Sequence, residues 1–188
     1  MDKLKTKKES RTVEEMNNAV DECRVIFIKK MEDYGTSWHI MRPSSLTDQI
    51  FIKAKRIRYI EENGEENTLI KEGIRPEFIG IVNYGAMALI QLERRDYEKS
   101  LSKEEALKLY DRMINDSVSL MYNKNHDYNE AWRQMRVSSF TDIILQKLYR
   151  TREIENNNGK TIISEGIDAN YMDIINYALF ALIKLKNE

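Results

Sequence analysis

The sequence predicts an all-α protein: a six-helix bundle built from two tandem three-helix repeats with pseudo-twofold symmetry. Two observations predict this fold. Of the 188 residues only seven are glycine and two are proline, so the chain lacks the turn residues that a sheet protein of this length needs. In addition, the second half of the chain repeats the first, and apolar residues recur at helical spacing in both halves.

The internal repeat can be read directly from the sequence. Residues 30–60 align with residues 124–154 at a constant offset of 94, and 15 of the 31 positions are identical. After a shift of one residue, 72–92 align with 165–185, with 10 identities in 21 positions. Chance does not produce such an alignment, so the chain contains a duplicated unit.

The repeat divides the chain into three parts. We expect a flexible tail over residues 1–11, a first helical unit over residues 12–95 and a second over residues 102–188, packed together as one globular domain. The polar segment between residues 95 and 101 is the predicted link between the units.

The first helix of each unit is marked by its two ends. Capping boxes, in which a hydroxyl and a glutamate bond each other's backbone amides, predict starts at Thr12 and Ser102. Gly35 and Asn129 follow the predicted ends, and both residues tolerate the left-handed conformation of a C-terminal cap. By these marks, the second copy of this helix is about one turn longer.

The second and third helices of each unit follow. Ser45 and Ser139 are cap-like starts of the second helix, Pro76 lies in the first turn of one third helix, and Asp168 caps the other. The third helix is apolar nearly all round, as residues 174–183 show. A three-helix unit cannot cover such a helix alone, so we expect the two third helices to pack against each other.

A lysine in the second helix of each unit is the most informative polar residue. Helical projection places Lys53 within the apolar stripe of its helix, and Lys147 repeats this placement, with Arg56 and Arg150 at the edge of the stripe. An amine directed toward a core requires a carboxylate or a phosphate. Either these cations form structural ion pairs, or they line a cationic pocket and donate to the phosphate of a ligand.

The third helix offers the groups that could meet these cations. Asn176 and Tyr177 interrupt an apolar helix, and a buried amide or phenol needs a partner. Asp173 lies one turn before Tyr177, whereas Gly80 stands at its position in the first unit. If Asp173 meets Lys147 or a ligand, only the second unit keeps this acid.

Aromatic and basic residues follow the first helix of each unit. They either fasten the loop to the core or stack on a base while the arginine contacts a phosphate. The residues are Tyr34, Trp38 and Arg42 in the first unit, and Tyr128, Trp132 and Arg136 in the second.

Two aspartates are the candidate catalytic residues. Asp142 and Asp173 could orient a water molecule or a metal ion, although the spacing of Asp142 from Ser139 also fits a capping box. We predict no metal site, because the sequence has no paired histidines or cysteines and its acids do not form a recognisable carboxylate cluster. The cofactor is therefore undetermined, and Mg²⁺ stays open.

Composition excludes several classes of protein. The 30 basic and 31 acidic residues give a net charge of −1, which argues against binding to DNA or to an anionic membrane by bulk charge. No apolar run is long enough to cross a bilayer, and the N-terminus lacks the pattern of a signal peptide. With one cysteine and hence no internal disulfide, we expect a cytoplasmic protein.

The repeated motifs together resemble a known family. The pattern consists of Tyr-Gly-x-x-Trp, then Ser-x-x-Asp followed by Lys-x-x-Arg, and then Asp-x-x-Asn-Tyr-Ala. It is similar to that of the nucleotide-modification-associated domain family, an all-helical family found in tandem copies in some members. The resemblance covers residues 30–92 and 124–185 and is better in the second unit. It implies an association with nucleotide or base modification.

The helical layout also resembles the all-α nucleoside-triphosphate pyrophosphohydrolases. Those enzymes hold magnesium with a Glu-Glu-x-x-Glu cluster, whose last acid is replaced here by Asn18 in the first unit and by Lys108 in the second. This departure argues against metal-dependent hydrolysis.

Two hypotheses about function follow. The first is a nucleotide-handling protein that binds a (deoxy)nucleotide phosphate, or another phosphate-bearing small molecule, in a cationic and aromatic pocket, with hydrolysis left open. The second is a non-catalytic helical adaptor whose repeated charges form ion pairs. Direct DNA binding is not expected, and the sequence leaves open whether the chain forms a homo-oligomer.

Overall fold

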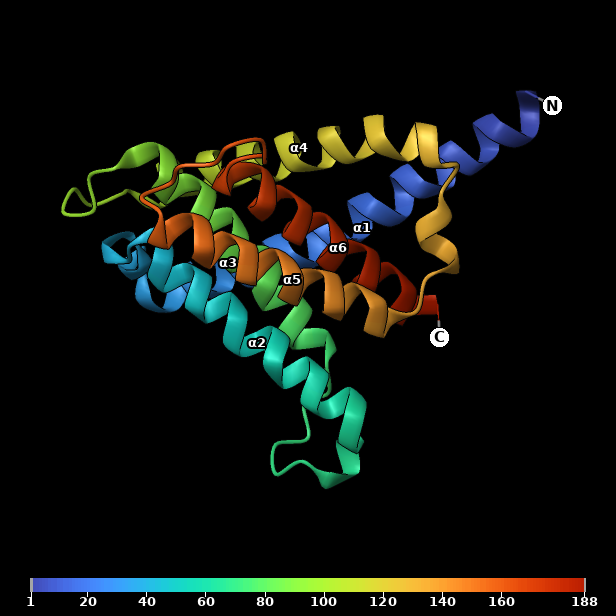
Figure 1. The fold of residues 1–188 in the computed structure, drawn as a ribbon, viewed down its shortest axis with the longest axis horizontal. Helices are drawn as coiled ribbons and strands as arrows, with labels where there is room; N and C mark the ends of the chain where they lie inside the picture. The colour runs from blue at the N-terminus through green and yellow to red at the C-terminus, as the bar shows by residue number, and fades with distance from the viewer. Residues whose placement is uncertain (1, 188) are drawn as a thin grey trace.

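The computed structural model describes residues 2–187, and the side chains among them except those of residues 2–10, 123–127 and 187. Within this range the chain is helical and has no strand, as predicted (Figure 1). The α-helices are α1 (Asp2–Tyr34), α2 (Pro43–Asn63), α3 (Arg75–Arg94), α4 (Lys103–Tyr128), α5 (Val137–Asn156) and α6 (Ile167–Asn187). Short 3-10 helices are η1 (Ser37–Ile40), η2 (Glu65–Asn67) and η3 (Ala131–Gln134).

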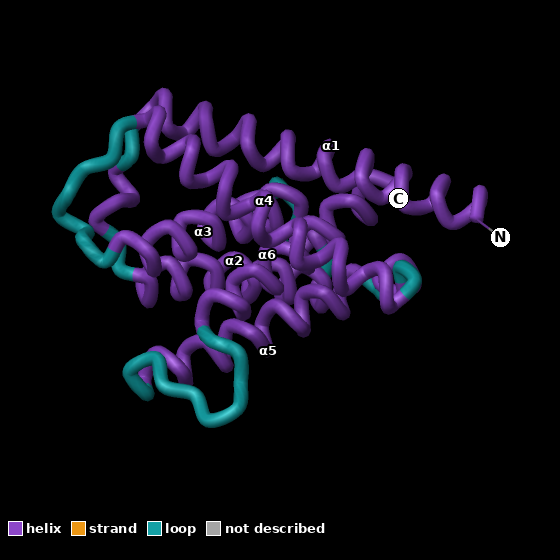
Figure 2. Tube along the Cα trace, turned by 90° about the horizontal axis from the view of Figure 1, so that it is seen from above, coloured by secondary structure: helices purple, strands orange, loops and turns teal. Residues whose placement is uncertain are grey.

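The helices α3 and α6 lie at the centre of the bundle and pack against each other, as the sequence predicts (Figures 1 and 2). On one side, α2 packs on α3, α5 packs on α6, and α2 and α5 contact each other. On the other side, both α1 and α4 contact the central pair. Because α3 and α6 are covered from both sides, they supply much of the buried apolar core.

The capping box predicted at the start of α4 is confirmed, but the one predicted at Thr12 is wrong. The Ser102 Oγ accepts from the Glu105 amide at 3.2 Å, and the Glu105 carboxylate accepts from the Ser102 amide at 3.0 Å. In contrast, α1 begins at Asp2, so Thr12 lies inside a helix and its buried hydroxyl bonds Glu130. Residues 2–11, predicted as a tail, contain no glycine or proline and favour continuation of the helix.

The second helix of each unit also begins earlier than the sequence predicts. The first residues are Pro43 in α2 and Val137 in α5, so the predicted caps Ser45 and Ser139 lie in the first turn. Proline suits the first helical position, because its missing N–H would have had no helical partner there. The same shift in both units shows that the repeat extends to the helix boundaries.

Reciprocal contacts between α2 and α5 show the pseudo-twofold relation between the units. Each hydroxyl or guanidinium group of one helix bonds a carboxylate of the other, and the partners in the two halves differ by the offset of 94. The four pairs are Thr47 with Glu155 at 2.7 Å, Thr141 with Glu61 at 2.8 Å, Arg152 with Asp48 at 2.6 Å, and Arg58 with Asp142. Hence Asp142 and Asp48 act in cross-unit ion pairs and not in capping boxes.

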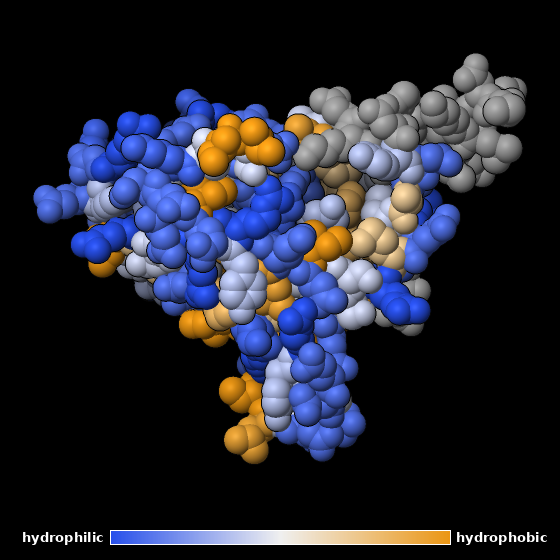
Figure 3. Space-filling model, in the orientation of Figure 1, coloured by the Kyte–Doolittle hydropathy of each residue, from blue (hydrophilic) through white to orange (hydrophobic). Residues whose placement is uncertain are grey.

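The surface drawn in Figure 3 is largely hydrophilic. Hydrophobic atoms project from the loop between α2 and α3, where Leu69 is fully exposed and Ile70 is more than half exposed. None of the helices in the described part of the chain is long and apolar enough to cross a membrane.

The close approach of α3 and α6 predicts a pair of glycine variants with unequal effects. A Cβ at Gly85 would lie 2.7 Å from Cγ1 of the buried Ile175, whereas a Cβ at Gly80 would meet only the flexible end of Lys53. We expect Gly85→Ala to lower the free energy of unfolding by about 1–3 kcal/mol through overpacking. Gly80→Ala should cost less, because its Cβ displaces only the flexible end of Lys53 and alanine favours helix. Urea unfolding of both variants tests this, and equal effects would contradict it.

The cross-unit glutamates predict a dependence of stability on pH. Burial raises the pKa of Glu61 and Glu155, although each accepts a hydrogen bond from a threonine. A carboxyl whose pKa is raised on folding loses stabilising free energy as pH rises from its unfolded to its folded pKa. We therefore expect Glu155→Gln to raise the melting temperature at pH 7, with the gain disappearing toward pH 4. The exposed Glu62→Gln is the control, and a gain that persists at pH 4 would contradict the prediction.

Candidate functional site

The predicted inward placement of Lys147 brings it to an acid of α6. The Lys147 Nζ lies 2.5 Å from Asp173 Oδ2, and both side chains are only 13% exposed. The apolar stripe of α5 places the lysine and α6 places the aspartate, so the pair links two helices of one unit. A poorly exposed amine thus has the carboxylate that its burial requires.

In the first unit the inward lysine pairs with an acid that lies one turn earlier on the third helix. Lys53 Nζ lies 3.0 Å from Glu77 Oε2, and Arg56 also bonds Glu77. By the repeat, Glu77 corresponds to Asn170 and Gly80 to Asp173. Repeat alignment therefore identifies the lysines of both units, but it does not identify Glu77, because its counterpart is an amide.

A pocket of about 230 Å³ opens beside Asp173, and we call it the second-unit pocket. Its aromatic wall contains Trp132, which stacks on Phe180 with ring centroids 4.3 Å apart and planes 8° from parallel. Its lining residues come from α4, η3, α6 and the segment that follows η3. They are Met121, Tyr128, Ala131, Trp132, Met135, Asp173, Asn176, Tyr177 and Phe180.

Two buried polar atoms of the lining residues have no hydrogen-bond partner. Asn176 is 5% exposed, and its Nδ2 donates to the Ser117 carbonyl at 2.8 Å, which leaves its Oδ1 as an unpaired acceptor. Trp132 Nε1 is an unpaired donor. Unpaired buried groups are rare in native proteins, because each loses its hydration without compensation. Two residues that line the second-unit pocket therefore each carry a buried polar atom without a partner, and Trp38 of the first unit has the same unpaired Nε1.

A matching pocket of about 210 Å³ lies in the first unit, and we call it the first-unit pocket. Six of its residues occupy repeat positions of residues that line the second-unit pocket, namely Met121, Tyr128, Asp173, Asn176, Tyr177 and Phe180. Its lining residues are Ile26, Phe27, Lys30, Tyr34, Lys53, Pro76, Ile79, Gly80, Asn83, Tyr84 and Met87. The duplication has therefore produced two related pockets.

The equivalent asparagine of the first-unit pocket is fully paired. Asn83 Nδ2 donates to the Cys23 carbonyl at 3.1 Å, and its Oδ1 accepts from the Tyr110 hydroxyl at 2.8 Å. Tyr110 belongs to the other unit, and Met16 occupies its repeat position. Because methionine has no hydroxyl, the Asn176 oxygen has no corresponding donor.

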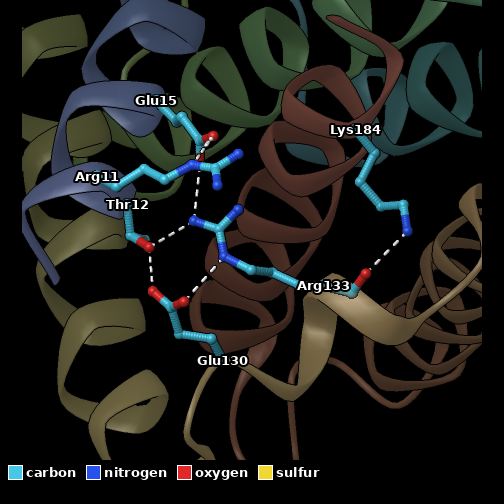
Figure 4. Close-up of polar contacts among 6 residues, drawn as sticks. All are labelled: Arg11, Thr12, Glu15, Glu130, Arg133 and Lys184. Carbon is cyan, nitrogen blue, oxygen red and sulfur yellow. Dashed lines mark hydrogen bonds and ion pairs between the residues drawn. The ribbon is translucent and has the colours of Figure 1, made fainter. Parts of the chain in front are cut away.

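A polar network that sequence reasoning missed holds the η3 wall of the second-unit pocket (Figure 4). Arg133, next to Trp132, donates to Thr12 and Glu15 of α1 at 2.7 Å each and to Glu130 at 2.9 Å. Burial raises the pKa of Glu15, but the hydrogen bonds from Arg133 and Arg11 outweigh burial and lower it. The repeat gives no signal of this network, because Thr36 and His39 occupy the positions of Glu130 and Arg133.

A second support of this wall comes from α6. Lys184 Nζ donates to the backbone carbonyl of Arg133 at 3.0 Å (Figure 4). It also donates to the carbonyl of Met135 at 2.6 Å. In the first unit Gln91 has the corresponding role, since its Nε2 donates to the carbonyls of His39 and Met41. Both units therefore fix this loop by a polar side chain of the third helix.

The predicted site residues fall into two groups. Besides Lys53 and Asp173, five of them line one of the two pockets: Tyr34, Tyr128, Trp132, Asn176 and Tyr177. Trp38 is buried next to the first-unit pocket, with its ring centroid 6.3 Å from that of Phe27. Arg42 and Arg136 are exposed and precede α2 and α5. Arg150 is half-buried on α5, and Asp142 is exposed beside Arg58.

This distribution separates the two predicted catalytic acids. Asp173 lines the second-unit pocket, whereas Asp142 is not among the lining residues and pairs with Arg58 of the first unit. Over the described residues, no group of three or more histidine, cysteine, aspartate or glutamate side chains could hold a metal ion. The described geometry thus offers a pocket for binding and no assembled pair of acids.

The repeated helical unit and its lysine, aromatic and asparagine positions define a class of tandem all-α domain. The family described as Nucleotide modification associated domain 1 matches residues 30–92 and 124–185, one match in each unit. The chain belongs to this family and carries the domain in two tandem copies. Comparison with curated proteins and with solved structures gives no match.

The Lys147–Asp173 pair predicts non-additive effects on stability. We expect Lys147→Met alone to lower the free energy of unfolding by up to about 3 kcal/mol, because it leaves a poorly exposed carboxylate without its cation. Lys147→Met combined with Asp173→Leu should recover to within about 1 kcal/mol of the parent, since an apolar pair avoids that cost.

Urea unfolding of the single and double variants measures this coupling. Arg152→Met serves as the control at an exposed pair with Asp48, where the expected loss is below about 1 kcal/mol. A double variant that is less stable than Lys147→Met would contradict the expectation.

Proposed function

We propose that the chain binds a nucleoside or nucleotide through its base in the second-unit pocket. The unpaired Asn176 Oδ1 and Trp132 Nε1, both on residues that line an aromatic-walled pocket, are the observation that carries this proposal. A ligand that pairs both atoms must donate a hydrogen bond to Asn176 Oδ1 and accept one from Trp132 Nε1. Nucleobases have this chemistry.

The dimensions and charge of the pocket support a base more than a whole nucleotide. About 230 Å³ lies below the usual range of roughly 300–1,000 Å³ for drug-sized ligands. Asp173 adds carboxylate oxygens, which accept hydrogen bonds and attract an amino group. Bases with an exocyclic amino group should therefore bind better than bases without one, while the sugar and phosphate extend past the exposed Tyr128.

The family supplies independent support of a general kind. Its description associates the domain with nucleotide modification, and recognition of a base is a step that such a role requires. The contacts of Lys147, Arg136 and Arg150 to phosphate stay predictions, because Lys147 is engaged by Asp173. Hydrolysis likewise stays a hypothesis.

Tryptophan fluorescence provides a direct test, because the chain has two tryptophans: Trp132 lines the second-unit pocket, and Trp38 packs beside Phe27 of the first-unit pocket. In Trp38→Phe the remaining Trp132 reports on the second-unit pocket. We expect cytidine or adenosine to change this fluorescence by binding at the edge of the Trp132 ring, at lower concentrations than uridine. In the matched variant Trp132→Phe, Trp38 should respond weakly or not at all.

Calorimetry of the same variants measures the contribution of the Trp132 N–H to ligand affinity. Trp132→Phe keeps an aromatic ring but loses the N–H, so the affinity for cytidine should fall about threefold to tenfold, whereas Trp38→Phe should retain it. If no nucleoside changes the Trp132 fluorescence or releases heat, the proposal is overturned and the helical adaptor is the better hypothesis.

A further inference from the structure

The two pockets face opposite ends of their ion pairs. In the second unit the carboxylate of Asp173 lines the pocket, and Lys147 is not among its lining residues. In the first unit Lys53 lines the pocket, and its partner Glu77 is buried outside it. Each ion pair is neutral as a whole, but the acid lines the pocket in the second unit and the lysine lines it in the first.

A shift of the acid by one helical turn causes this reversal. Glu77 lies three residues before Gly80, the position that Asp173 occupies in the second unit, and three residues correspond to about 4.5 Å along a helix. A Cβ at Gly80 would lie 2.5 Å from Lys53 Cε and 3.0 Å from its Nζ. The absence of a side chain at Gly80 therefore lets the lysine cross α3 where the second unit has its acid.

The remaining polar groups of the first-unit pocket are donors or are already paired. Lys30 is a second cation in the lining, and the lining contains no aspartate or glutamate. Burial raises the pKa of Tyr34, so its hydroxyl keeps its proton at neutral pH. The Asn83 oxygen, which could attract a donor, is occupied by Tyr110. The pocket therefore offers positive charge and an O–H donor.

From this geometry we infer that the first-unit pocket binds a phosphate group, as inorganic phosphate or as a phosphate monoester. Lys53 then lies between Glu77 and the bound anion, with Lys30 as the second cation. Arg56 keeps Glu77 compensated while Lys53 contacts the ligand. The Tyr84 ring, 5.9 Å from Lys53 Nζ, provides a surface for an organic group attached to the phosphate.

This inference does not rest on the base-binding proposal. It concerns the other unit and a ligand that needs no base. It also assigns different chemistry to the two copies. An acid and an asparagine with an unpaired oxygen line one pocket, and two lysines line the other. The copies are thus specialised for different ligand groups.

Isothermal titration with inorganic phosphate and with phenyl phosphate, at constant ionic strength, tests the site. We expect saturable binding that weakens at least tenfold in Lys53→Met. The control is Lys55→Met, an exposed lysine of the same helix, which should bind as the parent does. Phenyl phosphate binding more tightly than phosphate would indicate an esterified ligand, and equal binding would indicate free phosphate; both support the site.

A second variant keeps the inference testable if Lys53→Met does not fold. Gly80→Asp places the acid of the second unit in the first-unit pocket, so phosphate binding should also fall at least tenfold, with circular dichroism confirming the helical fold. Trp132→Phe, in the other pocket, should bind phosphate normally. The inference is overturned if the parent protein binds neither probe, if Lys55→Met loses binding as much as Lys53→Met, or if only Trp132→Phe loses it.

Discussion

The face-to-face packing of α3 on α6 is the constraint on which the rest of the structure depends. Both helices are apolar over most of their circumference, so neither unit can cover its own central helix. The close approach at Gly85 and Ile175 brings the two units into one core. Because this contact fixes the pseudo-twofold relation, it also sets the register of α2 against α5 and allows the reciprocal hydroxyl and arginine contacts between them.

Within this frame, the inward lysines impose a second requirement, since each needs a carboxylate on the neighbouring central helix. The two units meet it with acids one turn apart, Glu77 and Asp173. The stability of the fold requires only that a carboxylate meet the lysine, so an acid at either position serves. The position of the acid nevertheless decides which member of the ion pair lines the adjacent pocket. A shift of the acid by one turn therefore changes which ligand groups the pocket can bind.

The pocket of one unit also depends on the other unit. The η3 wall beside Trp132 is held by Arg133, which bonds Thr12 and Glu15 of α1. The paired or unpaired state of the asparagine on each central helix is likewise set across the units, through Tyr110 in one case and Met16 in the other. Each pocket is lined by residues of its own unit, but contacts from the other unit help to shape it.

The sequence by itself determined the helical class, the duplication, the central place of the third helices and the inward direction of Lys53 and Lys147, because periodicity and repeat spacing are local properties of the chain. It did not determine the start of α1, the role of Asp142, the partner Glu77 or the Arg133 network. These depend on which side chains distant helices bring together, as Thr12 and Glu130 illustrate. Only the tertiary structure decided that the two pockets are lined by opposite ends of their ion pairs, since that follows from which turn of the third helix carries the acid that each lysine meets.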